Sequence, residues 1–331
     1  TITGASLVPP DDRPLLGNGT RFQFTDVVGT DPIFLRGLKI ARLAADSPSP
    51  IMLSGETGTG KEVFAQSIHN YSRRGGKSFV AINCAAIPEN LLEGLLFGTT
   101  RGAFTGAVTR QGIFEQAHEG TLLLDELNAM PINLQAKLLR VLQERRLRRV
   151  GGTRDIAIDL KIISSVNVDP HTAIKAGQLR SDLYYRLGVV FIAIPPLRQR
   201  PQDIDLLTRH FIHLNNHKLN KLVSGISSKV MALFHRYQWP GNVRELEHVV
   251  EGTMNVLGGE NRIEHHHLPI HFFHPDFGAL TGAEPPVAVC RPFAEPGREA
   301  PGGNASIQDV NLLGRQKHQE RELIAEHLAA T

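Results

Sequence analysis

Two short stretches of the chain carry the residue types needed to hold and cleave a chain of phosphates. The first is rich in small residues and ends in a lysine: Gly55, Glu56, Thr57, Gly58, Thr59, Gly60 and Lys61. Glycines let successive backbone N–H groups turn toward one anion, and the lysine reaches the β- and γ-phosphate oxygens. The second stretch is the acidic pair Asp125 and Glu126, which follows three leucines. Together these stretches predict a site that hydrolyses a nucleotide.

The two acids predict a division of labour during hydrolysis. Phosphoryl transfer to water needs one acid that orders hydrated Mg²⁺, here Asp125, and one that polarises the attacking water, here Glu126. The residue after Lys61 is Glu62 instead of the Ser or Thr that usually binds Mg²⁺ at this position. The metal ion must then depend more on water and on Asp125. The role of Glu62 itself stays open.

Alternating strand and helix patterns must position these residues. Short apolar runs of strand length occur at residues 51–54, 79–82, 122–124, 160–166 and 189–194. Helical patterns separate most of them, at 62–68 and 134–142, and Asp31-Pro32 begins an earlier helix. This alternation predicts an α/β fold with a parallel, doubly wound sheet. Both chemical stretches then lie at the carboxyl ends of strands, where such sheets bind ligands.

The rest of the chain divides by composition. After Pro195-Pro196 three helical patterns follow, at 204–214, 227–237 and 243–257, and predict a small α-helical lid. Residues 145–161 predict a hairpin with Gly151-Gly152 at its turn. The expected domains are a linker at 1–20, an α/β subdomain at 21–197, the lid at 198–272, a disordered linker at 273–310 and a last, thinly apolar helical segment at 311–331.

Composition narrows the class of protein. The 331 residues include 36 Lys and Arg against 33 Asp and Glu, a net charge of +3, so no strong global field indicates nucleic acid. Cys84 and Cys290 are far apart and form no disulfide framework, which favours a reducing cytoplasm. No apolar run approaches the roughly 20 residues of a membrane span, and no signal peptide is present. Because the chain begins at Thr1 without Met, a fragment of a cytoplasmic protein is expected.

A third stretch lies between the phosphate loop and the acids: Gly102, Ala103, Phe104, Thr105, Gly106 and Ala107. Small residues around one Phe and one Thr predict an exposed, movable loop. The combination resembles the bacterial enhancer-binding proteins, the AAA+ activators of sigma-54 RNA polymerase, over roughly residues 22–269. The resemblance implies ATP and Mg²⁺ as cofactors, a hexameric ring, and contact of this loop with sigma-54.

The resemblance also implies roles for two asparagines and two arginines. Asn83 matches a switch residue that restrains the catalytic glutamate, and Asn167 matches the γ-phosphate sensor. Either asparagine could instead cap the turn that follows it. Arg180 and Arg186 match the fingers that reach the nucleotide of a neighbouring subunit, although most surface arginines are only solvated charge.

Further features follow from the same resemblance or are set aside. Arg244 matches a second sensor in the lid, and Val27, Val28 and Gly29 match the adenine pocket. Four arginines near the hairpin favour a mechanical role beside the ring pore over DNA contact: Arg145, Arg146, Arg148 and Arg149. The run His265–His267 is predicted to be a loop, because adjacent histidines lack the spacing of helical metal ligands. Cys84 is predicted to be a small buried residue.

Two departures from the common family pattern point to a subgroup. They are Phe97-Gly98-Thr99-Thr100 and Leu127-Asn128-Ala129-Met130, and both look like the arginine-utilisation (RocR-type) regulators. One rival is another ring motor, such as a helicase or chelatase, which lacks this exposed loop. The other is a non-enzymatic DNA-binding regulator. This second alternative depends on the helix expected at 316–329, which resembles the start of a Fis-type helix-turn-helix. Enhancer DNA is assigned to a domain missing from this sequence.

Overall fold

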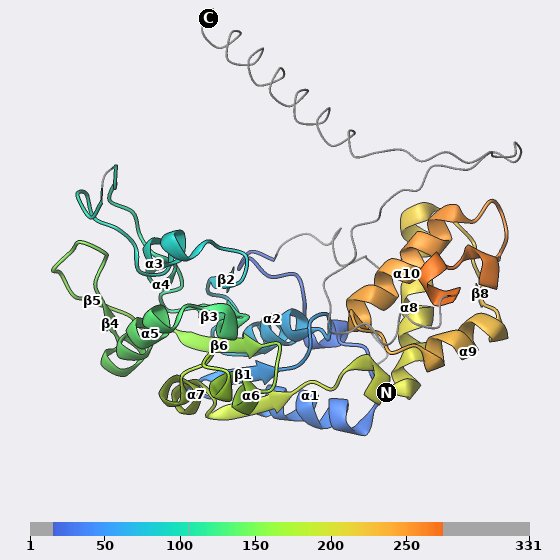
Figure 1. The fold of residues 1–331 in the computed structure, drawn as a ribbon, viewed down its shortest axis with the longest axis horizontal. Helices are drawn as coiled ribbons and strands as arrows, with labels where there is room; N and C mark the ends of the chain where they lie inside the picture. Colours follow the sequence, from blue (N-terminus) through green and yellow to red (C-terminus); the bar gives the residue numbers. More distant parts are fainter. Residues whose placement is uncertain (1–15, 105, 274–331) are drawn as a thin grey trace, which may run out of the picture. The chain divides into compact units, whose positions relative to one another are not determined.

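The computed structural model describes residues 16–104 and 106–273 (Figure 1). The linker expected at 273–310, apart from Phe273, and the segment expected at 311–331 lie outside the described residues. Residues 1–15 and Thr105 also lie outside them.

A five-stranded parallel sheet forms the centre of the first part of the chain. Its strands are β1 (Ile51–Ser54), β2 (Phe79–Asn83), β3 (Thr121–Asp125), β6 (Lys161–Val166) and β7 (Val190–Ala193). Their order is β2-β3-β6-β1-β7, and every pair is parallel. All six residues of β6 are buried, as expected for a strand covered on both faces. The predicted doubly wound α/β fold is confirmed.

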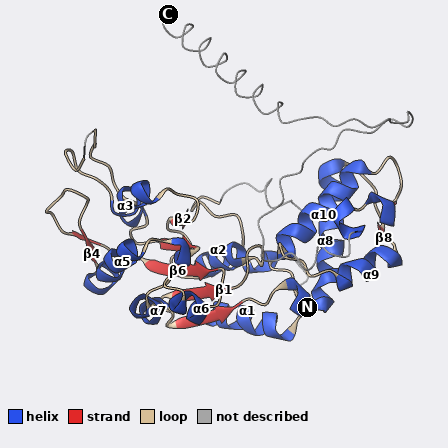
Figure 2. Ribbon diagram, viewed as in Figure 1, coloured by secondary structure: helices blue, strands red, loops and turns tan. Residues whose placement is uncertain are grey.

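Helices cover both faces of this sheet (Figure 2). They are α1 (Pro32–Ala44), α2 (Lys61–Tyr71), α3 (Glu89–Phe97), α4 (Ile113–Gln116), α5 (Ile132–Glu144), α6 (Pro170–Lys175) and α7 (Ser181–Leu187). The start of α1 is the one the sequence predicts. The Asp31 carboxylate accepts hydrogen bonds from the amides of Ile33 and Phe34, and Pro32 occupies the first turn.

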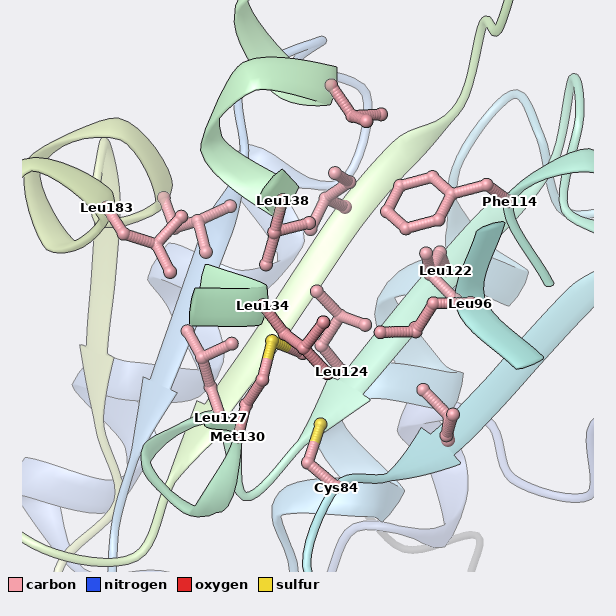
Figure 3. Close-up of a cluster of buried hydrophobic side chains, with 14 of the residues drawn as sticks. Cys84, Leu96, Phe114, Leu122, Leu124, Leu127, Met130, Leu134, Leu138 and Leu183 are labelled. Atoms are coloured by element: carbon pink, nitrogen blue, oxygen red, sulfur yellow. The ribbon is translucent and has the colours of Figure 1, made fainter. Parts of the chain in front are cut away.

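Each face of the sheet has its own hydrophobic cluster. On one face, leucines of α3 and α5 pack against β3, with Phe114 beside them (Figure 3). On the other face, Phe34 of α1 and Phe64 of α2 meet edge to face at 5.5 Å between ring centroids. Cys84 is buried in the first cluster, as predicted, and burial raises the pKa of its thiol to about 12. The sheet is therefore packed against apolar side chains on both faces.

The described start of the chain is packed against the α/β part, which corrects one expectation. Residues 16–20 were expected to belong to a linker. Asn18 instead donates to the Asn70 side chain at 2.7 Å, and its carbonyl accepts the Phe79 amide at 3.0 Å. Thr20 is fully buried. A short polar segment without periodicity can thus be fixed by hydrogen bonds that its own pattern does not reveal.

The lid is a helical unit with its own core. It contains α8 (Pro201–Leu219), α9 (Ser228–Arg236) and α10 (Asn242–Val256), which confirms the three predicted helices. A small parallel pair joins β8 (Gly225–Ile226) to β9 (Arg262–Ile263). Trp239, the one tryptophan of the chain, is fully buried and lies 5.1 Å from the Phe234 ring. None of the helices described in residues 16–104 and 106–273 is long and apolar enough to cross a bilayer.

The histidine run is ordered differently from the prediction. His265–His267 is a short 3-10 helix instead of a loop. The ligand atoms of Glu260, His266 and His267 lie within 4.8 Å of one another. However, the Glu264 amide donates to Nδ1 of His267 at 3.0 Å, so the neutral ring carries its hydrogen on Nε2. That N–H group lies 3.8 Å from the Glu260 carboxylate, and a ring nitrogen that carries a hydrogen has no lone pair to offer a metal ion.

Candidate functional site

The phosphate loop connects β1 to the first turn of α2. Gly58 and Gly60 have φ angles of +80° and +99°, which L side chains rarely adopt, so the glycines are required by the backbone path. Lys61 is the first residue of α2 and is 8% exposed. Its ammonium donates to the carbonyls of Gly55 at 2.7 Å and Glu56 at 3.0 Å. These contacts hold the cation inside the loop, beside the helix N-terminus that favours anions.

Burial and nearby acids act in opposite directions on the lysine. Burial lowers the pKa of Lys61, and the charges of Asp125 and Glu126 raise it. The acids thereby help to keep the ammonium protonated in a desolvated place. A positive loop facing two carboxylates can accept the combined charge of a phosphate chain and a divalent cation.

A serine that the sequence reasoning missed positions both acids. The Ser165 hydroxyl on β6 donates to Oδ1 of Asp125 and accepts the amide of Glu126 at 3.0 Å. Glu126 has φ 53° and ψ 49°, a left-handed conformation uncommon for a residue other than glycine. Such strain persists where surrounding contacts hold it, and it concentrates at functional sites. The sequence feature that could have revealed this residue is a pair of adjacent serines within a strand whose residues are all buried.

One pocket brings most of the predicted residues together. Its volume is about 650 Å³, large enough for a nucleotide, and it lies between the α/β part and the lid. The predicted residues that line it are Val27, Val28, Thr57, Gly58, Thr59, Gly60, Lys61, Glu62, Asn83, Asp125, Glu126 and Arg244. The predicted Gly29 follows the lining residue Val28, and the predicted Gly55 and Glu56 precede the lining residue Thr57 in the chain. The predicted Asn167, Arg180 and Arg186 are not among the described residues that line it.

The wall expected to face adenine is fixed by a buried charge from the lid. Asp203 of α8 accepts the amide and hydroxyl of Thr30 at 2.6 and 2.9 Å. Arg200 lies 3.9 Å from Asp203 and stacks 4.6 Å above the Phe34 ring, and both charged side chains are fully buried. A side chain added at Gly29 would meet the Phe34 ring at 2.4 Å. The segment is therefore held from two sides.

Glu62 has a partner within the chain. Its carboxylate accepts Nε2 of Gln66 at 3.0 Å. The Gln66 carbonyl oxygen then faces the other way and accepts the amides of Arg21 and Phe22 at 2.8 and 3.1 Å. Arg21 and Phe22 line the pocket. Glu62 therefore orients an amide that fixes one wall of the pocket.

The two asparagines expected to act as switch and sensor both make local contacts. The Asn83 side chain accepts a hydrogen bond from the Ala85 amide at 2.8 Å, so it caps the turn that follows its strand. Asn83 also lines the pocket together with Glu126. The Asn167 side chain accepts Nδ2 of Asn128 at 3.0 Å. Asn128 lies in the segment that follows the two acids, so this bond links the sensor candidate to the chain just after Glu126.

The two arginines expected to act as fingers do not line the chain's own pocket. Arg180 precedes the first turn of α7, and its guanidinium binds Asp182 through two contacts of 3.0 and 2.7 Å. Arg186, in the last turn of α7, donates to the Leu142 carbonyl at 3.0 Å. Both contacts are exposed, and exposed pairs are easily exchanged for others.

The loop at 102–107 projects from the end of α3. Its base is closed by paired hydrogen bonds of 3.0 Å between Thr99 and Arg110. Phe104 is 60% exposed, as expected for a contact residue. Ala107 is only 8% exposed, so the expectation of an exposed segment is wrong for this last residue.

The predicted hairpin is present and is bonded to that loop (Figure 1). β4 (Arg146–Leu147) pairs with β5 (Ile156–Ala157) in antiparallel fashion. The Val150 carbonyl accepts the Thr100 amide at 3.1 Å, and the Val150 amide donates to the Gly98 carbonyl at 2.9 Å. Two of the four hairpin arginines are neutralised within the chain, because Arg148 binds Asp155 and Arg149 binds Glu115. The mechanical role expected for these arginines stays a prediction.

Comparison with known proteins agrees with this geometry. Residues 27–193 match the Sigma-54 interaction domain, and residues 198–280 match an AAA+ ATPase lid domain. The chain is 53% identical over 253 residues to the transcriptional activator RocR of Bacillus subtilis, covering 76% of this chain and 55% of RocR. It is 46% identical over 241 residues to the regulatory protein AtoC of Escherichia coli, covering 72% of this chain and 52% of AtoC. The chain thus spans about half the length of these relatives.

A solved structure shows the same fold. NtrX from Brucella abortus in complex with ATP superimposes with a TM-score of 0.69 at 34% identity, covering 75% of this chain and 57% of NtrX. The phosphate loop, the paired acids and the helical lid are the parts of the chain that form the pocket. The match over 27–193 and the lid match that follows it cover the same parts. The chain belongs to the sigma-54 interaction domain family of AAA+ proteins.

Proposed function

We propose that this chain is the ATP-hydrolysing motor of a sigma-54-dependent transcriptional activator. The single observation that carries the proposal is the pocket that joins the phosphate loop, the two acids and Arg244 of the lid. The family match favours this reading over a helicase- or chelatase-like motor. A purely DNA-binding regulator would have no use for Lys61 and for an acid pair held by a buried serine.

In this proposal the chain's own residues divide the work of hydrolysis. The loop amides and Lys61 hold the phosphates, and Glu126 polarises the attacking water. Asp125 has the hard oxygen donor that Mg²⁺ prefers, and Ser165 fixes its orientation, so the donor set fits a hydrated magnesium ion. Bound there, Mg²⁺ supplies charge neutralisation on the phosphate oxygens. Arg244 reports the nucleotide to the lid.

The proposal includes a ring and a partner protein. Arg180 and Arg186 do not line the chain's own pocket and make only exposed contacts, so in this proposal they complete the site of a neighbouring copy. Head-to-tail contacts of this kind close into cyclic assemblies, and the family likeness makes the ring a hexamer. The 102–107 loop then acts on sigma-54, and a further domain binds enhancer DNA.

The first test is the dependence of hydrolysis on metal ion and protein concentration. We expect Mg²⁺-dependent release of phosphate from ATP, with a specific activity that rises with protein concentration because each site needs a neighbour. Phosphate release is measured across a dilution series, with EDTA as the control. A specific activity that stays constant on dilution into the monomeric range would contradict the shared site.

A second prediction separates the motor from its output. Thr105→Ala should leave ATP hydrolysis nearly unchanged, because the described neighbours Phe104 and Gly106 are not among the residues that line the pocket. It should abolish capture of sigma-54. The measurement is a pull-down of sigma-54 with ADP–aluminium fluoride, and Thr153→Ala, at an exposed threonine outside the loop, serves as the matched control. Undiminished capture by Thr105→Ala would show that the loop is not the contact surface.

A further inference from the structure

The start of lid helix α10 is bonded directly to the phosphate loop. The Gly58 carbonyl accepts the amides of Val243 and Arg244 at 3.0 and 3.3 Å. The first N–H groups of a helix have no partner within it, so the phosphate loop caps this one. The two backbones are also in close contact, because a side chain at Gly58 would lie 2.1 Å from the Gly241 carbonyl oxygen.

Asn242 lies at the centre of this junction. It is fully buried and has a φ of 52°, a conformation that asparagine tolerates better than most residues. Its Nδ2 donates to the Thr57 carbonyl at 3.0 Å and to the Glu56 carboxylate at 3.2 Å. Its Oδ1 accepts the Leu197 amide at 2.8 Å. One side chain thus bonds the phosphate loop, the lid and the connection between the lid and β7.

Glu56 extends the junction to that connection. Its carboxylate receives both Nη atoms of Arg198, one of them at 2.7 Å. These bonds lower the pKa of Glu56, so it stays ionised. Arg198 binds the carboxylate on one side, and the lone pairs that remain on its oxygens accept a hydrogen bond from the side-chain amide of Asn242 on the other side.

We propose that Asn242 is a positioning residue that couples the phosphate loop to the lid, so that a bound nucleotide sets the position of Arg244. This coupling rests on the proposed ATPase function and deepens it. When phosphates bind, the N–H groups of the loop turn toward the phosphates. The carbonyl groups of the loop, which point to the opposite side, are then fixed as well. The carbonyls of Thr57 and Gly58 then hold the start of α10, from which the Arg244 side chain departs.

The test uses Asn242→Asp, which changes one atom of the junction. The substitution keeps the acceptor for the Leu197 amide and the tolerance for positive φ. It replaces the donor with an oxygen that repels the Glu56 carboxylate and the Thr57 carbonyl. We expect KM for ATP to rise roughly tenfold, the effect of one lost hydrogen bond to a charged group, with a smaller change in kcat. Asn255→Asp, the same chemical change at an exposed site of α10, should behave as wild type.

Three further measurements keep the inference falsifiable. Asn242→Gly keeps the backbone conformation, removes every side-chain bond and should also raise KM. Glu56→Gln in the Asn242→Asp background removes the repulsion between carboxylates and should recover part of the loss. The response of Trp239 fluorescence to ADP, read without turnover, should shrink in both Asn242 variants. Folding is checked by thermal unfolding.

The outcomes separate the inference from the proposed function. Folded Asn242 variants with wild-type KM and a wild-type fluorescence response would overturn the coupling while leaving the ATPase function intact. A wild-type chain that binds ADP through this junction but never hydrolyses ATP would overturn the function and leave the coupling standing.

Discussion

Mixing an Arg180→Ala chain with a Lys61→Ala chain should restore ATP hydrolysis that neither chain shows alone. The first variant lacks a finger for its neighbour and keeps its own phosphate loop, and the second has the opposite defect. Some interfaces of a mixed ring then combine an intact loop with an intact finger. An arginine finger contributes roughly 10³–10⁵ in rate, so the rescued signal should rise well above either parent. Phosphate release is measured across mixing ratios at constant total protein.

The structure explains why rescue should occur. Arg180 is bonded to Asp182 on the surface and does not line the pocket of its own chain. Its loss leaves the contacts of Lys61 with the Gly55 and Glu56 carbonyls untouched. Arg236→Ala, an exposed arginine of α9, is the control and should keep full activity without a partner. If subunit exchange shows that mixed rings form and hydrolysis stays at the parental level, Arg180 acts in its own chain or only structurally.

Glu126→Ala should bind ATP and fail to hydrolyse it. The phosphate loop and Lys61, which hold the phosphates, do not depend on this carboxylate for their contacts. Removal of a general base lowers a rate by about 10²–10⁴, so turnover should fall by at least that range. Glu126→Gln, which keeps the shape and loses the charge, should be as inactive. ATP binding is measured by equilibrium titration and turnover by phosphate release.

The chain contains a matched control for this change. Glu119 lies just before β3, is exposed and has φ 60°, so Glu119→Ala removes a glutamate from the same left-handed conformation. It should hydrolyse ATP at the wild-type rate. Equal turnover by wild type and Glu126→Ala would refute the assignment of the catalytic acid. If Glu119→Ala lost ATP hydrolysis to the same extent, the loss in Glu126→Ala would be explained by the change of a left-handed residue and not by the missing carboxylate.

The parts of the site that the sequence predicts are those whose chemistry lies in contiguous residues. The phosphate loop needs glycines, a lysine and the following helix in one stretch, and the acid pair ends one strand. The domain boundaries and the roles of individual residues stay predictions. The structure corrects the linker at 16–20, where Thr20 is buried, and the loop at 265–267.

The residues that the sequence reasoning missed act across long separations. Ser165 reaches Asp125 over 40 positions, Asp203 reaches Thr30 over 173 and Asn242 reaches Thr57 over 185. A buried serine, aspartate or asparagine is conspicuous only when the fold shows what surrounds it. Periodicity indicates which face of an element is apolar, and it does not reveal which distant backbone amide a polar side chain will meet.

The bonds between Val150 and the base of the 102–107 loop have a mechanical consequence. A single glycine-containing loop yields under load by rotating its own dihedral angles. Here the stem of the loop is supported by the hairpin, because Gly98 and Thr100 form hydrogen bonds with Val150 and Arg149 forms an ion pair with Glu115. Compliance is confined to the tip, where Gly102 and Gly106 have φ near +87° and +81°. We therefore expect a displacement of the sheet to be transmitted to Phe104 through this two-stranded stem with little loss of amplitude.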